Sequence, residues 1–492
     1  MFLDEVKLNV QPIYINFEVG NFPGDYIKTQ TVPKEIYEKT IAEKTAVFNQ
    51  LKGINLLKPI VVESEKEVMA LSGKMSRDID FILTTVAGPR GIGGKYGGHR
   101  HIMSTELLIS DTLKLPLIML ATDIWDCFCM ETSGAIRERG GKAYFAPTIE
   151  QMNKFLKIQQ VKKAMAKSKI LNFNNVNRYT TPLDRNTHVT SPYDPRMIKE
   201  MTGIDVEYYP ISTLAEDVKG ISDAQGKKAA DAYFKGATSV KTLYTPDEHD
   251  EKYRVNFGKL DTAIRNAIKN KGATAMAGCC DLATAPIYAP ACLTLTWLKD
   301  EGIPSFCEAD LGTGIPMIML HFLANEPADM GNVCINAVGV KNMMEFEVPN
   351  PDKNTLTVNH CVTPRKLKGY DKPADTYEII GGFLPAYYGN IGAGGITHVA
   401  HIQTGVTVTL ARISANANKM LLAKGTLKKS GFTPATGNRQ ISYIDIGMDT
   451  NVFWEKFQSN FGNHLCFVYG DHVEEMAGLC KELGIEPMIA NA

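Results

Sequence analysis

Residues 304–332 read PSFCEADLGTGIPMIMLHFLANEPADMGN. The spacing of apolar residues, which predicts the fold, changes within this stretch. Before it, short apolar runs typical of strands alternate with helical patterns. After it, apolar residues recur with a period of two, as in half-buried strands. Glu308 and Asp310 stand where an apolar strand ends and a helix begins. Because ligands bind in α/β sheets at the carboxyl ends of strands, this stretch also predicts a site.

The first 330 residues alternate strand and helix patterns in two series. Nearly continuous apolar runs separated by helices indicate parallel sheets that are covered on both faces. A Lys-rich helix predicted over residues 149–168 divides the series. The pattern therefore predicts a Rossmann-like α/β domain over residues 1–168 and a second one over residues 169–330, which carries the Glu308 segment. The predicted strands are residues 79–87, 116–121 and 142–146 in the first domain, and 169–173, 205–209, 274–277 and 304–308 in the second.

The third part of the chain, residues 331–492, is predicted to be a β-rich, barrel-like domain with a terminal helix. Six strand-like runs fall within about 80 residues and are separated by Gly, Pro and Asn turns, which is typical of a barrel or a sandwich. A further strand over residues 464–469 precedes a helix over residues 472–483 that Gly484 ends. The six runs are residues 333–340, 344–348, 355–360, 376–380, 395–402 and 406–413.

The composition and the apolar runs argue against several classes of protein. The net charge of −1, from 53 basic and 54 acidic residues, disfavours nucleic acid as the main partner, because neutralising phosphates requires a basic surplus. No apolar run is long enough to span a membrane, and the first ten residues, MFLDEVKLNV, do not resemble a signal peptide. None of the ten cysteines lies in a CxxC, so we expect reduced, buried thiols in a cytoplasmic protein.

Glu308 and Asp310 are the first candidates for chemistry. Two carboxylates at the end of a strand can hold a metal ion or act as acid and base. Asp310 has a simpler explanation, because it stands where the N-cap of the following helix is expected. Glu308 is flanked by apolar residues, and we predict that it is functional.

Two histidines are further candidates. His360 ends a strand in NHCVTP (residues 359–364), and His464 begins one after Gly462. Each alone can be explained as a structural residue. Together with Glu308 they form a set of oxygen and nitrogen donors that suits Mn²⁺ or a similar divalent ion better than thiolate-bound zinc. His398 and His401 form an HxxH, but on a strand these two side chains face opposite ways.

The order of these segments resembles the superfamily of L-fucose isomerase and L-arabinose isomerase. The matching segments are CEAD (307–310), PADMGN (327–332), HCVTP (360–364), VTVTLARI (406–413) and GNHLCFVYGDHVEEMAGLCKELGIEP (462–487). The resemblance covers residues 169–492 well and the first domain loosely. It implies two Rossmann-like domains, a β-barrel domain and a homo-oligomer, a trimer or hexamer, whose sites lie between subunits. It also implies that Glu308 and His464 ligate the metal, with His360 as a further ligand.

One position departs from the family pattern. The resemblance implies a second acidic ligand where this chain has Asn332. Family isomerases use two carboxylates to move a proton between neighbouring carbons through an enediolate. An amide can ligate a metal but cannot relay a proton at neutral pH. Asn332 therefore argues against simple aldose–ketose isomerisation, while metal binding remains expected. The candidate catalytic residues are therefore Glu308, Asn332 and Asp310, and the candidate metal ligands are Glu308, Asn332, His464 and His360.

A Gly-rich loop in the first domain offers candidate substrate contacts. Residues 88–101 read GPRGIGGKYGGHRH, in which exposed amides and the cations of Arg90 and Lys95 can cradle an anion. A flexible surface loop is an equally good interpretation. Trp125 follows a predicted strand and can stack on a sugar face, although packing in the core explains it equally well.

These observations predict a manganese-dependent enzyme that acts on a sugar or a sugar-like hydroxy-carbonyl compound, which is anionic if residues 88–101 bind it. The leading hypothesis is a ketol isomerase-like reaction through an enediolate. An epimerase or a carbon–carbon lyase acting on the same intermediate needs fewer carboxylates and is the alternative. A sugar-binding protein without activity is the rival from another class, since two Rossmann-like lobes also describe sugar receptors.

Overall fold

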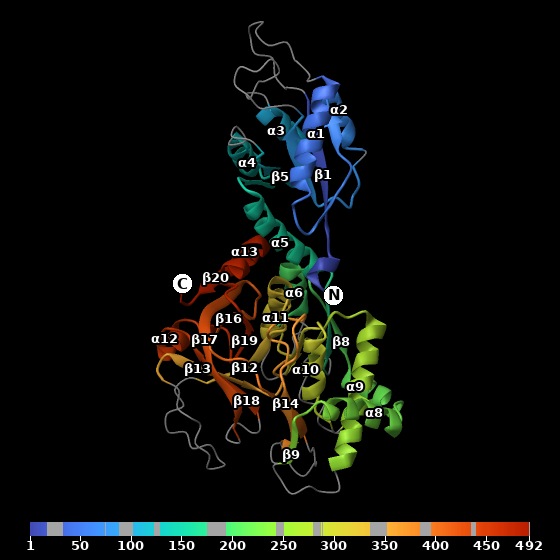
Figure 1. Cartoon of the computed structure of the whole chain (residues 1–492), viewed down its shortest axis with the longest axis vertical. Helices are drawn as coiled ribbons and strands as arrows, with labels where there is room; N and C mark the ends of the chain where they lie inside the picture. The colour runs from blue at the N-terminus through green and yellow to red at the C-terminus, as the bar shows by residue number, and fades with distance from the viewer. Residues whose placement is uncertain are drawn as a thin grey trace. The chain divides into compact units, whose positions relative to one another are not determined.

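A computed structural model of the chain describes two compact units, which are residues 4–163, and residues 164–492 together with residues 1–3 (Figure 1). Among the residues that it describes, no helix is both long and apolar enough to cross a membrane. The described residues are 1–16, 33–73, 75–87, 102–122, 128–174, 193–242, 250–278, 287, 289–334, 352–383, 395–433 and 439–491.

The unit of residues 4–163 contains a parallel sheet covered on both faces, as predicted. The strand order is β2-β1-β4-β5-β6, and β3 also pairs with β1. Side chains of β1 alternate between two apolar clusters, with Val10 in one and Ile13 in the other. The strands are β1 (Leu8–Ile15), β2 (Ile54–Leu56), β3 (Ile60–Val62), β4 (Phe81–Val86), β5 (Leu117–Leu120) and β6 (Ala143–Ala146). The helices are α1 (Lys34–Phe48), α2 (Glu65–Leu71), α3 (Ile102–Leu113) and α4 (Phe128–Glu138), followed by α5 (Ile149–Ala166).

The second unit begins with another parallel sheet, whose strand order is β11-β10-β7-β8. Local signals set its helix ends: Asp194 caps the first turn of α6, and Gly203 ends that helix at a φ of 77°. The strands are β7 (Lys169–Phe173), β8 (Asp205–Tyr209), β10 (Ala275–Gly278) and β11 (Ser305–Cys307). The helices are α6 (Pro195–Thr202), α7 (Ile211–Lys219), α8 (Asp223–Lys235), α9 (Asp250–Lys271), α10 (Cys292–Asp300) and α11 (Leu311–Ala324).

A closed antiparallel barrel of six strands follows, which confirms the predicted β-rich part. The strands pair in the order β16-β19-β12-β13-β18-β17, and β17 pairs back with β16 to close the barrel. The barrel strands are β12 (Asp329–Cys334), β13 (Thr355–His360), β16 (Val406–Ile413), β17 (Lys419–Thr433), β18 (Arg439–Asp445) and β19 (His464–Tyr469). Helices α12 (Thr450–Lys456) and α13 (Val473–Leu483) and the strand β20 (Glu486–Ile489), which pairs with β17, complete this part.

Two of the predicted barrel strands belong elsewhere. β14 (Tyr377–Phe383) and β15 (Gly395–Ala400) form a separate three-stranded sheet with β9 (Ser239–Thr242), in which β9 and β14 are parallel. The period-two pattern identified both strands but carries no information about their partners. The strand predicted over residues 333–340 begins earlier, at Asp329, and most of that range, together with residues 344–348, lies outside the described residues.

Helix α11 joins the second parallel sheet to the barrel. Every residue from Leu311 to Leu323 is buried, so the helix has no polar, solvent-facing side. It contacts β10 and β11 of the sheet as well as β16 and β19 of the barrel, and Figure 1 shows it beside the two barrel strands. The segment that enters α11 is therefore held against the barrel strand β19, which begins at His464.

Candidate metal centre

The turn between β11 and α11 aims Glu308 toward the barrel. Glu308 and Ala309 both adopt left-handed backbone conformations, with φ of 58° and 51°. Such conformations are unfavourable for residues other than Gly and persist only where the surroundings impose them. Here the N–H of Ala309 donates to the carbonyl of Gly278 on the neighbouring strand, at 3.0 Å. The two residues turn the chain sharply before Asp310 starts the helix.

Glu308, His360 and His464, which lie far apart in the sequence, meet at this turn. Nε2 of His360 lies 3.5 Å from Oε1 of Glu308, and Nε2 of His464 lies 3.6 Å from Oε2 of the same carboxylate. The ligand atoms of the three residues all lie within 4.8 Å of one another. Both histidines are buried, while the Glu308 side chain keeps 13% of its exposure. One carboxylate and two imidazoles at these distances can surround a divalent ion that remains reachable from one side.

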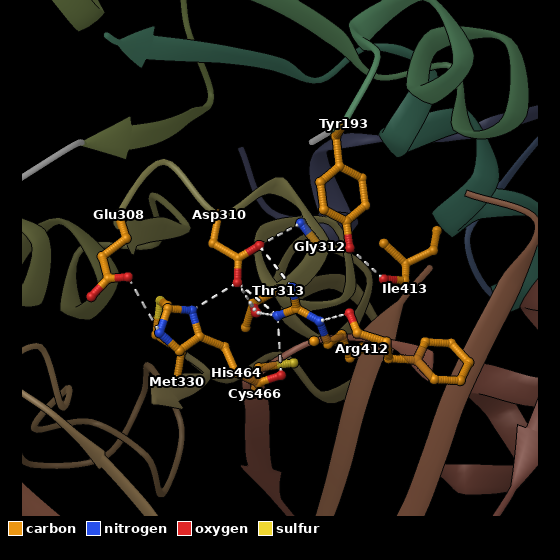
Figure 2. A network of polar contacts seen from close by, with 12 residues as sticks. Tyr193, Glu308, Asp310, Gly312, Thr313, Met330, Arg412, Ile413, His464 and Cys466 are labelled. Atoms are coloured by element: carbon orange, nitrogen blue, oxygen red, sulfur yellow. Dashed lines mark hydrogen bonds and ion pairs between the residues drawn. The ribbon is translucent and has the colours of Figure 1, made fainter. Parts of the chain in front are cut away.

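Asp310 is the N-cap of α11, as its simpler explanation predicted, but it also holds His464. Its Oδ1 accepts from the N–H of Gly312 at 2.9 Å. Its Oδ2 lies 2.8 Å from Nδ1 of His464, so the imidazole stands between Asp310 and Glu308 (Figure 2). Asp310 is fully buried, and His464 separates its carboxylate from Glu308. The position suits a residue that orients an imidazole rather than one that touches a substrate.

Electrostatics fix the protonation of this pair. Burial alone would raise the pKa of Asp310, but the charge of Arg412 and the hydrogen bond to His464 outweigh it and hold that pKa well below its usual range. Burial lowers the pKa of His464, against the opposing influence of Asp310. A neutral His464 beside an ionised Asp310 donates its Nδ1–H to the carboxylate, which leaves the lone pair of Nε2 facing Glu308.

The environment of that lone pair fits a bound cation. Nε2 of His464 is buried and makes no hydrogen bond to any of the described residues. It faces a carboxylate oxygen, and two acceptors with no proton between them repel each other. A divalent ion between them removes the repulsion, and a carboxylate bonded to the second nitrogen of a metal-binding histidine is a common support. The residues therefore fit a metal ion.

Arg412 on β16 is the functional residue that sequence reasoning missed. It is almost completely buried and lies 2.7 Å from Oδ2 of Asp310 through Nη1, while its Nε donates to the carbonyl of Phe461 at 2.6 Å. Gly462 leaves room for it, because a Cβ there would lie against the guanidinium group. An arginine inside the apolar run VTVTLARI was the available signal, since a buried arginine requires an acidic partner.

Asn332 lies in the strand ladder beside this centre. On β12 it pairs directly with His464 of β19 on one side and with Asn359 of β13 on the other. Directly opposite residues point to the same face of a sheet, so Asn332 shares a face with His464. The nearest acidic residue in its strand, Asp329, is buried 3.9 Å from Lys299 and does not replace it. The described part of the centre thus contains two carboxylates, of which Asp310 is engaged with Arg412.

The other predicted contacts lie outside the described residues. Arg90, Lys95 and Trp125 belong to this group, so their roles stay predictions. His398 is buried, and its Nε2 contacts the carbonyl of Thr363, whereas His401 is exposed. This arrangement agrees with the expectation that the HxxH of residues 398–401 does not supply paired ligands.

No protein-family model matches the chain, and no curated protein matches it either.

Proposed function

We propose that the chain is a divalent-metal-dependent enzyme that acts on a sugar or a sugar-like hydroxy-carbonyl compound in a ketol isomerase-like reaction. The observation that carries the proposal is the position of His464, whose Nδ1 is held by Asp310 while the lone pair of its buried Nε2 faces Glu308. The resemblance to the L-fucose and L-arabinose isomerases supports the substrate class.

Glu308, His360 and His464 would hold the ion. One carboxylate and two imidazoles are hard and intermediate donors, so Mn²⁺ or a similar ion suits them. When bound, such an ion polarises a substrate carbonyl and hydroxyl and stabilises negative charge on their oxygens. Asp310 and Arg412 keep the imidazole of His464 in one orientation, and thus in the tautomer that ligates.

Proton transfer rests on few groups. Glu308 keeps a partly exposed carboxylate and is the group best placed to accept a proton from a substrate carbon. Asp310 is fully buried behind His464 and is committed to Arg412. Asn332 cannot take up a proton at neutral pH. Among the described residues of the centre, Glu308 is therefore the one carboxylate that can act as a base.

This observation favours a second candidate function at the same site. An epimerase or a carbon–carbon lyase needs one base and a stabilised enediolate, whereas an isomerase relays a proton between two carbons. Asn332, which pairs across the strands with His464, supports this candidate, because the resemblance implies a second carboxylate at its position. Residual isomerase activity with stronger epimerase or lyase activity is the pattern expected if this candidate is correct.

A turnover assay with Mn²⁺ over a panel of aldoses, ketoses and their phosphates or acids tests the proposal. Product analysis by NMR distinguishes isomerisation, epimerisation and cleavage. Binding of a sugar without turnover of any panel member, with or without Mn²⁺, would instead identify a non-catalytic sugar-binding protein and overturn the proposal.

Three further parts of the proposal come from the sequence and the resemblance. We expect the protein to be cytoplasmic and to form a homo-oligomer, a trimer or hexamer. Sedimentation velocity measures the oligomeric state. We also expect residues 88–101 to bind an anionic substrate through Arg90 and Lys95. Alanine at either position should then raise KM more than it lowers kcat, because a contact made equally in the ground and transition states is lost. Trp125 would stack on the sugar.

A further inference from the structure

Two buried cysteines from different parts of the second unit lie in direct contact. Cys292 is the first residue of α10, and Cys361 directly follows β13 of the barrel. Their Sγ atoms lie 3.1 Å apart, although the two residues are 69 positions apart in the sequence. The candidate metal centre uses neither sulfur as a ligand, so this contact needs an explanation of its own.

Hydrogen bonds hold the backbone on both sides of the contact. Oγ1 of Thr296 donates to the carbonyl of Cys292 at 3.1 Å, and Oγ1 of Thr397 donates to the carbonyl of Cys361 at 3.2 Å. A disulfide bond is about 2.05 Å long, so the two sulfurs need to approach each other by only about 1 Å. Rotation of the side chains supplies a movement of this size, and the backbone can stay in place.

The surroundings of the pair suit oxidation by a small reagent. Cys292 keeps 6% of its exposure and Cys361 keeps 4%, which disfavours a bulky oxidant such as another protein. Buried thiols in apolar surroundings are inert, but this pair has polar neighbours. Nδ1 of His360 lies 3.5 Å from Sγ of Cys361, and the buried Lys299 of α10 interacts electrostatically with the same thiol.

The reaction balances with one peroxide molecule for each pair of thiols. The peroxide transfers an oxygen atom to one sulfur, which becomes a sulfenic acid, and its O–O bond breaks with release of water. The second thiol then attacks that sulfur, so that the S–S bond forms, the S–O bond breaks, and the hydroxyl leaves as water with the thiol proton. The two sulfurs together lose two electrons, which the peroxide gains. Because the second sulfur is already in contact, it traps the sulfenic acid before an irreversible sulfinic acid forms.

Oxidation changes the neighbour of a candidate metal ligand. Nε2 of His360 faces Glu308, so Nδ1 carries the proton of the imidazole whenever Nε2 binds an ion. Sγ of Cys361 lies 3.5 Å from that Nδ1 and can support it as a weak acceptor. A disulfide bond draws this sulfur toward Cys292. Changing the support of the second nitrogen of a metal-binding histidine lowers metal affinity.

We propose that Cys292 and Cys361 form a reversible oxidation site, at which a small hydroperoxide such as hydrogen peroxide creates a disulfide that weakens binding of the ion at the candidate metal centre. Formation of the disulfide rests on the contact between the two sulfurs. Its effect on the ion rests on the proposed function as well. A dithiol reductant reverses the reaction by thiol–disulfide exchange.

Peptide mapping tests the oxidation site. The full, reduced chain is treated with hydrogen peroxide, its remaining thiols are alkylated under denaturing conditions, and the protein is digested with chymotrypsin. This protease cuts after aromatic residues and leucine, so Cys292 and Cys361 enter separate peptides that contain no other cysteine. Mass spectrometry should find these two peptides linked, and dithiothreitol should separate them. Cys307→Ser is the matched control, because Cys307 is also buried near Cys361 and its loss should leave the link intact.

Calorimetric titration with Mn²⁺, after removal of the peroxide, tests the effect on the ion. The oxidised wild type should bind Mn²⁺ about 10-fold more weakly than the reduced protein, and treatment with dithiothreitol should restore the affinity. Cys292→Ser keeps Cys361 but cannot form the disulfide. Its Mn²⁺ affinity should be the same before and after peroxide, which also controls for oxidation of methionines.

Any of three results overturns the proposal. These are the absence of the linked peptides, a disulfide that joins Cys361 to Cys307 in place of Cys292, and equal Mn²⁺ affinity of the oxidised and reduced wild type. The peptide map of the wild type requires no variant, so a variant that does not fold leaves this test in place. Glu308→Gln should form the disulfide as the wild type does. If neither state of the wild type binds Mn²⁺, the proposed function and the effect on the ion both fail, and the linked peptides still decide whether the oxidation site exists.

Discussion

Oδ2 of Asp310 lies 2.8 Å from Nδ1 of His464, and both residues are fully buried. A helix N-cap therefore also determines which nitrogen of an imidazole faces the candidate metal centre. The same carboxylate neutralises Arg412, so one side chain supports the helix start, the barrel strand and the candidate ligand at once. Substitutions here should affect metal affinity and stability together.

Asp310→Asn should lower the affinity for Mn²⁺ by about 10–100-fold, because the support that fixes the His464 tautomer is weakened. It should also reduce the free energy of unfolding by about 3–5 kcal/mol, because Arg412 is left as an uncompensated buried charge. Calorimetric titration with Mn²⁺ and urea unfolding measure the two effects. Asp300→Asn is the matched control, because Asp300 forms a comparable buried pair with Arg365. It should destabilise the protein without changing Mn²⁺ affinity. Equal Mn²⁺ affinity in both variants would count against the role of Asp310.

Glu308→Gln and His464→Ala should each abolish stoichiometric binding of Mn²⁺. The first replaces the only carboxylate in the donor set with a neutral amide, and the second removes an imidazole. Elemental analysis after equilibrium dialysis measures the bound metal. His472→Ala, a histidine at the start of α13 that bonds to Glu475, should bind the metal as the wild type does. Full occupancy in both site variants would show that the ion, if any, binds elsewhere.

Asn332→Asp should tighten Mn²⁺ binding through its added charge and raise any residual isomerase activity. In an isomerase, loss of one positioned acid–base group costs about 10²–10⁴-fold in rate. We therefore expect weak or absent turnover of fucose, arabinose and related aldoses by the wild type. The value of kcat/KM with Mn²⁺ for both proteins checks this. Wild-type turnover at ordinary enzymatic rates, lowered by Asn332→Asp, would restore plain isomerisation as the best proposal.

Glu326 should make the protein less stable as pH rises from about 5 to about 8. Burial raises the pKa of Glu326 from 4.5 to about 7, with His472 acting in opposition. The folded state therefore holds a proton that the unfolded state has lost over this range, so the free energy of unfolding falls until the folded carboxyl ionises. Glu326→Gln should stabilise the protein by about 1–3 kcal/mol at pH 8 and by little at pH 4.5.

Urea unfolding at several pH values measures the difference. Glu474→Gln, an exposed position on α13, serves as the control and should leave the pH dependence unchanged. A Glu326→Gln variant whose pH profile matches the wild type would mean that another group causes the loss of stability.

The sequence predicted the architecture where the local pattern carries the information. Continuous apolar runs identified the parallel strands, and Gly484 marked a helix end that the structure confirms through its left-handed conformation. β17 and β18 escaped prediction. The stretch KGTLKKSGFT in β17 breaks the alternation because its solvent-facing and bulged positions carry Lys, Gly and Ser. Strand partners were equally inaccessible, since pairing β14 with β9 joins residues about 140 positions apart.

The candidate site was predictable in its residues but not in its geometry. Glu308, His360 and His464 were recognisable from their places at strand ends and from the family resemblance, and the structure brings them together. Metal binding stays a prediction. The sequence predicted that Asp310 is an N-cap but not that it holds His464, because an N-cap pattern carries no information about a histidine 154 residues away. The role of Arg412 could be recognised only from the three-dimensional contacts.

The consecutive left-handed conformations of Glu308 and Ala309 imply that the stability of this turn and the positioning of the Glu308 carboxylate place opposing demands on position 309. Glycine adopts this conformation freely, so Ala309→Gly would relieve local strain while giving the turn more freedom to move. Relief of strain alone therefore favours glycine, whereas alanine restricts the turn and so helps to keep the Glu308 carboxylate aimed at the histidines. Laboratory evolution toward heat tolerance should find this position readily, and the variants that it selects should hold the Glu308 carboxylate least firmly.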